Sequence, residues 1–261
     1  MVALSGLPRL GVGVGFRAEM QPEYLKHSDQ IDWFELIADR HLPSVPESFA
    51  RALEMAKRYR FVPHGLELSI GTDAPLDLQY CAELRALIDG VGAPFYSDHL
   101  CFTRAGGYEI GQLTPLPFTA ATAHRCAVKA RQVQELLGVP LLLENISYGF
   151  TFPGELTEVE FISRVVTDGD CRLLLDLTNL FINSQNHHYD PYAFLAALPL
   201  HRVVQVHLAG GEKHAGRWID SHSQPVDVHP EVWSLLEYVV NRADVKAILI
   251  ERDQNFPADF G

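Results

Sequence analysis

The chain of 261 residues is 47% hydrophobic and 21% charged, which is typical of a globular protein with a sizeable core. Its formal net charge of −12 argues against nucleic acid or an anionic membrane surface as the main partner, because both attract a basic face. No apolar run approaches the roughly 20 residues that span a bilayer, and the N-terminus lacks the regions of a secretory signal. We therefore expect a cytoplasmic protein without a membrane segment.

In chain order, eight short apolar runs have the length and composition of β-strands. They cover residues 11–16, 32–37, 61–64, 94–100, 140–146, 172–177, 202–208 and 246–251. Helical patterns lie between them, at 22–28, 44–58, 75–91, 117–137, 157–167, 190–197 and 231–242. The spacings Ser44-x-x-Glu47 and Thr157-x-x-Glu160 predict two capping boxes, and Asp190 before Pro191 predicts a helix N-cap.

The strand runs are almost continuously apolar, which is typical of parallel strands buried on both faces. Eight strands alternating with helices favour an α/β fold of the (β/α)₈ TIM-barrel type over a doubly wound open sheet. The sequence ends soon after the last strand, so we expect the eighth helix to be short or absent. No linker or internal repeat interrupts the pattern, and we expect one domain over residues 1–261.

The cysteines are too widely spaced for a zinc ribbon or a thioredoxin-type redox site, because no Cys-x-x-Cys pair occurs. Cytosolic proteins keep their thiols reduced, and free cysteines are usually buried. We therefore expect reduced, core-facing thiols at Cys81, Cys101, Cys126 and Cys171.

Most of the later strands end on a histidine or a carboxylate. Because a parallel barrel gathers its strand C-termini on one rim, these side chains should converge although they are far apart in the sequence. The polar loop after the seventh strand can add a further carboxylate and a further histidine. The predicted metal ligands are His64, His99, Glu144, Asp176, His207, Asp220, His222 and Glu251.

Four carboxylates in one pocket cannot all stay ionised without compensating positive charge, and no lysine or arginine stands at a matching strand end. Two divalent cations would supply that charge. Imidazole ligands suit Fe, Zn or Mn better than Mg or Ca. Eight protein ligands are too many for one ion, which leaves a site with two or three ions as the interpretation.

The motifs also resemble those of the DUF692 family of multinuclear iron-dependent oxidative barrels, which includes the methanobactin biosynthesis oxidase and the thiaglutamate pathway enzyme. The matching segments are Ser97-Asp-His-Leu100, Leu141-Leu-Leu-Glu-Asn145, Leu173-Leu-Leu-Asp176, Val206-His-Leu-Ala-Gly210, Ile219-Asp-Ser-His222 and Ile250-Glu251. The resemblance implies a TIM barrel that holds two or three iron ions. It also implies O₂-dependent modification of cysteine residues in a ribosomally made precursor peptide, which a small companion protein presents.

Position by position, the resemblance places the family's ligands on the same eight residues and adds Asn179 as a further ligand or a supporting group. Asp98 and Asn145 stand beside ligands and could orient them, although the alternation of strand side chains could equally turn them outward. His188, with its neighbour His187, could be an extra ligand or an exposed residue that caps the turn before Asp190.

The main alternative keeps the barrel and changes the chemistry to that of a Zn- or Mn-dependent hydrolase or sugar isomerase, of the endonuclease IV or xylose isomerase type. An endonuclease should carry a basic DNA-facing surface, which the net charge of −12 disfavours. An isomerase of this kind usually has a catalytic lysine or histidine over the sugar, and no lysine stands at a strand end. A non-catalytic metal-binding protein is a further alternative.

Overall fold

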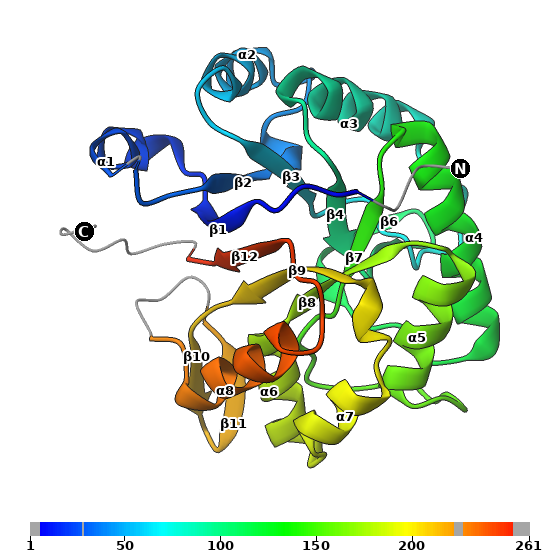
Figure 1. Cartoon of the computed structure of the whole chain (residues 1–261). Helices are drawn as coiled ribbons and strands as arrows, with labels where there is room; N and C mark the ends of the chain where they lie inside the picture. The colour runs from blue at the N-terminus through cyan, green and yellow to red at the C-terminus, as the bar shows by residue number, and fades with distance from the viewer. Residues whose placement is uncertain (1–5, 28, 222–226, 253–261) are drawn as a thin grey trace.

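The computed structural model describes residues 6–27, 29–221 and 227–252 of the chain. Eight parallel strands close into a barrel in the order β1–β12–β9–β8–β7–β4–β3–β2, and this closed ring confirms the predicted TIM-barrel fold (Figure 1). The barrel strands are β1 (Gly11–Gly15), β2 (Trp33–Ile37), β3 (Phe61–Gly65), β4 (Tyr96–His99), β7 (Leu141–Glu144), β8 (Arg172–Asp176), β9 (Val203–Leu208) and β12 (Ala247–Ile250).

Helices connect successive strands and cover the outside of the barrel (Figure 1). They are α1 (Gln21–Lys26), α2 (Pro46–Ala56), α3 (Leu78–Val91), α4 (Ala120–Leu137), α5 (Glu158–Asp168), α6 (Leu177–His187), α7 (Pro191–Ala197) and α8 (Pro230–Val240). Short 3₁₀ helices are η1 (Ala18–Met20), η2 (Ala38–Arg40) and η3 (Leu200–Arg202). Within the described ranges, no helix combines the length and apolar character needed to cross a membrane.

Two antiparallel hairpins extend from the carboxyl ends of barrel strands. One follows β4 and consists of β5 (Phe102–Ala105) and β6 (Tyr108–Thr114), which are joined by a turn at Gly106 and Gly107. The other follows β9 and consists of β10 (Gly211–His214) and β11 (Arg217–Asp220). The second hairpin corrects the prediction of a polar loop without regular structure in this region. Polar, glycine-containing strands exposed on a hairpin lack the apolar alternation that sequence patterns detect.

Helix starts were predicted with mixed success. Thr157 and Glu160 form the reciprocal capping box that opens α5, and Asp190 caps α7 through its side chain, both as predicted. The capping box predicted at Ser44 is wrong, because α2 begins at Pro46 with Val45 as its N-cap residue and no side-chain cap. The chain between β8 and α7 was not predicted to be helical, yet α6 occupies it.

The core consists of an apolar cluster inside the barrel and a larger one between the barrel and its helices. The inner cluster comprises Leu10, Trp33, Val62, Phe95, Leu142, Leu174, Val204, Ala247 and Leu249. The outer cluster holds most of the remaining buried aliphatic and aromatic side chains. All four cysteines are buried and free, as predicted. The predicted short or missing eighth helix concerns residues that follow β12 and lie outside the described ranges.

Candidate metal centre

The alternation of side chains along the barrel strands decides which residues reach the interior. Residues two apart on a strand point to the same face. Trp33, Val62, Leu142, Leu174 and Leu249 belong to the inner apolar cluster. The residues two positions after them therefore point inward too, one layer nearer the carboxyl ends of the strands. That layer consists of Glu35, His64, Glu144, Asp176 and Glu251.

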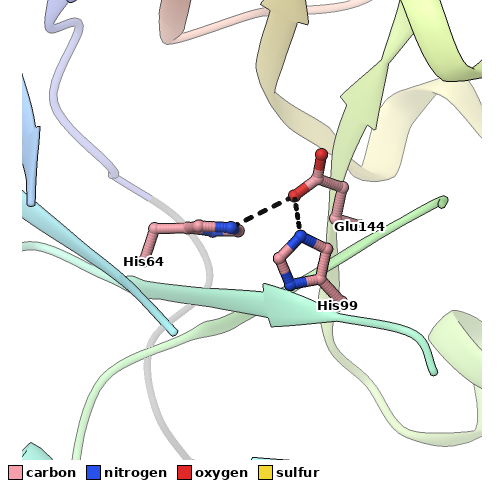
Figure 2. Close-up of side chains that lie close together, drawn as sticks. All are labelled: His64, His99 and Glu144. Atoms are coloured by element: carbon pink, nitrogen blue, oxygen red, sulfur yellow. Dashed lines mark ion pairs between the residues drawn. The ribbon is translucent and has the colours of Figure 1, made fainter. Parts of the chain in front are cut away.

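The first group of possible ligands comprises His64 on β3, His99 on β4 and Glu144 on β7, all buried. Figure 2 shows both imidazoles directed at one carboxylate from separate strands. The Nε2 atoms of His64 and His99 each lie 3.4 Å from Glu144 Oε2. The strand register contributes directly, since His99 and Glu144 are partners across β4 and β7.

The second group shares Glu144 and adds Asp176 and His207, again all buried. Asp176 and His207 are register partners on β8 and β9. His207 Nδ1 lies 3.5 Å from Glu144 Oε1 and 3.3 Å from Glu251 Oε2. The two oxygens of Glu144 thus face different groups, and this carboxylate connects them.

Each histidine is anchored through the nitrogen that points away from the carboxylates. His64 Nδ1 lies 2.9 Å from Ser97 Oγ, and His99 Nδ1 lies 3.2 Å from the carbonyl oxygen of Gly65. A carbonyl can only accept, so His99 carries its proton on Nδ1, and its Nε2 offers a lone pair to the centre. Such outer hydrogen bonds fix the tautomer and orientation of metal-binding histidines.

Glu35 was missed by the sequence analysis, and it performs the same role for His207. His207 Nε2 lies 3.0 Å from Glu35 Oε2, and Gln205 donates its Nε2 amide to the same oxygen at 2.5 Å. Because this carboxylate oxygen can only accept, His207 donates from Nε2, and its Nδ1 is turned toward Glu144 and Glu251. An acidic residue within the apolar run of β2 was the signal available in the sequence. It was overlooked because the prediction considered only residues at strand ends.

The separations between these donor atoms fit a shared cation better than direct hydrogen bonds. Charge-assisted hydrogen bonds are usually about 2.7–2.9 Å long. Ligand atoms arranged tetrahedrally at about 2.1 Å from an ion are about 3.4 Å from one another. Glu144 Oε2 and His207 Nδ1 are moreover buried without a hydrogen-bond partner in the described part of the chain. Both the spacing and the unsatisfied atoms are those of residues suited to hold metal ions.

The pKa shifts in the cluster show the effects of burial and of the carboxylates that meet there. Burial lowers the pKa of His99 to about 4, so this imidazole is neutral and able to coordinate. Burial raises the pKa of Glu144 above its usual value. Burial also opposes the charging of His207, but the carboxylates of Glu35 and Glu144 outweigh it and raise the His207 pKa well above the usual value. Without metal, His207 therefore retains a second proton, and coordination through Nδ1 would require a cation to replace that proton. Among the described residues, Glu35 and Glu144 form ion pairs only with histidines.

Asn145 and Asn179 hold the backbone around the ligands. Asn145 donates its Nδ2 to the carbonyl of Asp176 and accepts the Asp176 amide at Oδ1, both at 2.9 Å. Asn179 Nδ2 donates to the carbonyl of Asn145 at 3.1 Å, while its own backbone amide donates to Asp176 Oδ1 at 2.7 Å. Asp176 is therefore both a candidate ligand and the N-cap residue of α6. These hydrogen bonds of Asn145 and Asn179, which we call the strand bracket, fix the ends of β7 and β8 relative to each other.

Asp98 belongs to the layer between barrel and helices, because it is out of phase with the inward-facing Ser97 and His99. Its Oδ2 accepts the Tyr96 hydroxyl at 2.6 Å and the Leu68 amide at 3.3 Å, and its Oδ1 accepts the His99 amide at 2.7 Å. Of the two orientations considered above, the structure shows the outward one. Asp98 thus supports His99 through the backbone.

The remaining predicted site residues that the structure describes lie outside the two ligand groups. Asp220 ends β11 and is exposed, and it belongs to neither ligand group found among the described residues. His222 lies outside those residues. His188 is exposed at the left-handed C-cap of α6, and its neighbour His187 contacts the carbonyl of Tyr148 at 3.1 Å.

One basic side chain lies at the carboxyl end of β1, a strand that carries none of the predicted ligands. Arg17 follows β1 by two residues and is only 7% exposed. Its Nη1 donates to the carbonyl oxygen of Phe16 at 2.9 Å. The rim of the barrel thus includes one buried guanidinium at the carboxyl end of β1.

Several solved structures have the same barrel fold, although their sequence identity to this chain is low. Endonuclease IV from Thermus thermophilus matches 95% of this chain and 93% of its own with a TM-score of 0.58 and 17% identity. A D-psicose 3-epimerase solved with D-fructose matches 96% and 87% with a TM-score of 0.60 and 13% identity. The zinc-containing IOLI protein gives a TM-score of 0.62 at 11% identity, over 94% and 89%. These likenesses establish the fold.

Sequence relatives are much closer. A UPF0276 protein of Acaryochloris marina is 34% identical over 259 residues, covering 99% of this chain and 92% of the relative. A UPF0276 protein of Shewanella sediminis is 38% identical over 250 residues, covering 94% and 88%. Residues 11–259 match the model of the RiPP precursor modification enzymes MbnB/TglH/ChrH, where RiPP denotes a ribosomally made, modified peptide. The chain therefore belongs to the MbnB/TglH/ChrH family, an enzyme family that acts on RiPP precursor peptides.

Proposed function

We propose that this protein is a multinuclear non-haem iron oxidase that uses O₂ to modify cysteine residues of a RiPP precursor peptide. The observation that carries the proposal is the convergence of His64, His99, Glu144, Asp176 and His207 in one buried cluster, with Glu144 common to two ligand groups. Two groups around one carboxylate are the arrangement expected for a site with more than one ion. We propose Asp220, His222 and Glu251 as further ligands.

The donor set supports iron, because imidazole nitrogen together with carboxylate oxygen suits iron as well as zinc and manganese. When bound, iron supplies redox chemistry with O₂ and lowers the pKa of a coordinating thiol, so that the substrate cysteine binds as thiolate. The chain's own contribution is to hold neutral imidazoles in position and to balance charge. Its inner apolar cluster closes the barrel beneath the site and keeps water from reaching it from that side.

The family also supports a peptide substrate, and we propose that a small companion protein presents it. We further propose that residues 1–261 form a single domain and that the protein acts in the cytoplasm. The four buried, free thiols fit a reducing compartment.

The decisive experiment is metal analysis of protein purified without oxygen, followed by O₂ uptake with a cysteine-containing peptide. The proposal predicts at least two equivalents of iron and O₂ uptake that depends on the peptide. A matched peptide with serine in place of cysteine is the control and should give no uptake. Stoichiometric zinc or manganese, together with activity that needs no O₂, would instead support a hydrolase or isomerase.

A further inference from the structure

A pocket of about 590 Å³ lies outside the barrel between α5, α7 and the loop that follows β7. Its walls include five aromatic side chains, Phe118, Tyr148, Phe152, Tyr189 and Phe194. The pocket is open to solvent, and Figure 1 shows α5 and α7 next to each other on the outside of the barrel. None of the metal ligands proposed above lines it.

One of the polar groups in this pocket is the carboxylate of Glu158, in the first turn of α5. Its Oε2 accepts the hydroxyl of Tyr148 at 2.8 Å and that of Tyr189 at 3.4 Å. No hydrogen bond to Oε1 forms among the residues that the structure describes, and Glu158 itself lines the pocket. One oxygen of this partly buried carboxylate therefore remains available to a ligand.

The charges around this carboxylate favour a cationic ligand. The residues that line the pocket include the carboxylates of Glu158 and Asp190 but no lysine or arginine. Burial raises the pKa of Glu158 to about 7, because water is largely withdrawn from the carboxylate and no cation replaces it. An ammonium or guanidinium group at Oε1 would supply the missing charge, and the aromatic walls would cover its apolar stem.

The chain connects this pocket to the candidate metal centre in two places. The loop that carries Tyr148 begins directly after Glu144, and α6 runs from the N-cap residue Asp176 to His187, which lines the pocket. A small cavity of about 20 Å³ lies alongside, and its lining includes Asn145 as well as Glu158. A molecule in the pocket is therefore held next to segments that lead straight to the candidate ligands.

We propose that this pocket binds a lysine or arginine side chain of the precursor peptide. An open, aromatic pocket suits a side chain that enters from a larger molecule, and Phe150 and Phe152 in its loop are 50% and 38% exposed. These two rings pack edge to face with centroids 5.4 Å apart and offer apolar surface to the peptide beside the cation. The identity of the peptide rests on the proposed function, but the preference of the pocket for a cation does not.

The test measures binding of a dye-labelled, N-acetylated tripeptide amide, Ala-Lys-Ala, to the iron-loaded protein by fluorescence anisotropy at pH 8. The matched probe carries acetyl-lysine, which has a similar stem without the charge. We expect the lysine probe to bind at least tenfold more tightly than the acetyl-lysine probe. Glu158→Gln should abolish this preference, whereas Glu237→Gln, which removes an exposed carboxylate on α8, should retain it.

Ala193→Trp provides a second variant, because this exposed residue of α7 lines the pocket and a large side chain there should fill it. It should weaken binding of the lysine probe at least tenfold. Equal binding of the two probes, or an undiminished preference in Glu158→Gln, overturns the proposal. Full competition by free n-butylamine at the probe's own affinity would mean that the pocket takes small amines, which overturns the peptide as the source.

Iron content measured on every sample separates this inference from the proposed function. If the wild-type protein shows no lysine preference although its iron content and peptide-dependent O₂ uptake are as proposed, the pocket inference alone is contradicted. A preserved preference in protein that binds no iron contradicts the oxidase alone.

Discussion

Replacing Glu35 tests whether its hydrogen bond to His207 Nε2 positions this histidine for metal binding. Glu35 Oε2 accepts the Nε2 proton of His207 at 3.0 Å and the amide of Gln205 at 2.5 Å. In Glu35→Gln one oxygen can still accept, so a charge-assisted hydrogen bond becomes a neutral one, at a cost of about 1–1.5 kcal/mol. That free energy corresponds to about a tenfold loss of metal affinity, since about 1.4 kcal/mol is a factor of ten.

Glu35→Ala is the stronger variant, because it leaves the buried Nε2 proton of His207 without its acceptor. Carboxylates that support metal-bound histidines contribute about 10- to 100-fold to affinity, so we expect a loss near the upper value. The assay is competition with a chelator for Zn²⁺, used as a redox-silent probe. Glu237→Gln is the control and should bind as the wild type does. Two folded Glu35 variants with unchanged affinity would refute the assignment of Glu35 as the support of His207.

Three further predictions concern the ligands, the strand bracket and the pocket. Glu144→Gln should lose metal from both ligand groups while keeping its circular dichroism spectrum, because rim residues rarely hold a barrel together; unfolding would show a structural role. Asn145→Ala should lower the free energy of unfolding in urea by about 2–4 kcal/mol, since two buried backbone groups of Asp176 lose partners; Asn241→Ala, at an exposed position, is the control. The pKa of Glu158 is raised from 4.5 to about 7, so its contribution to stability is complete below pH 4.5 and is lost as the pH rises to 7. Relative to wild type, Glu158→Gln should therefore gain about 1–2 kcal/mol in urea unfolding between pH 5 and pH 8, allowing for partial solvent screening; a difference that does not vary with pH would contradict the raised pKa.

The sequence was sufficient to predict the barrel and most of its inward-facing layer. Strands buried on both faces are apolar throughout, so a charged or imidazole side chain at their end stands out. His64, His99, Glu144 and His207 were found in this way, and the strand register then explains their meeting. A sequence also shows helix caps when the pairing is local, as at Thr157.

What remained hidden depends on neighbours distant in the sequence. Glu35 lies in the middle of β2, and only barrel closure brings it to His207 on β9. The α6 segment is rich in asparagine, which has low helix propensity, and its start depends on Asp176 acting as both cap and candidate ligand. The outward orientation of Asp98 depends on which β4 residues point into the barrel. The sequence alone did not determine this, and the structure shows that Ser97 and His99 are the inward-facing residues.

The position of Glu144 between two ligand groups has a consequence for how the centre would be assembled. A residue held in common cannot adopt its final rotamer for one ion without also preparing the place of the other. Capture of the first ion would therefore favour capture of the second. Under metal scarcity the population should therefore divide into metal-free molecules and molecules with both ligand groups occupied.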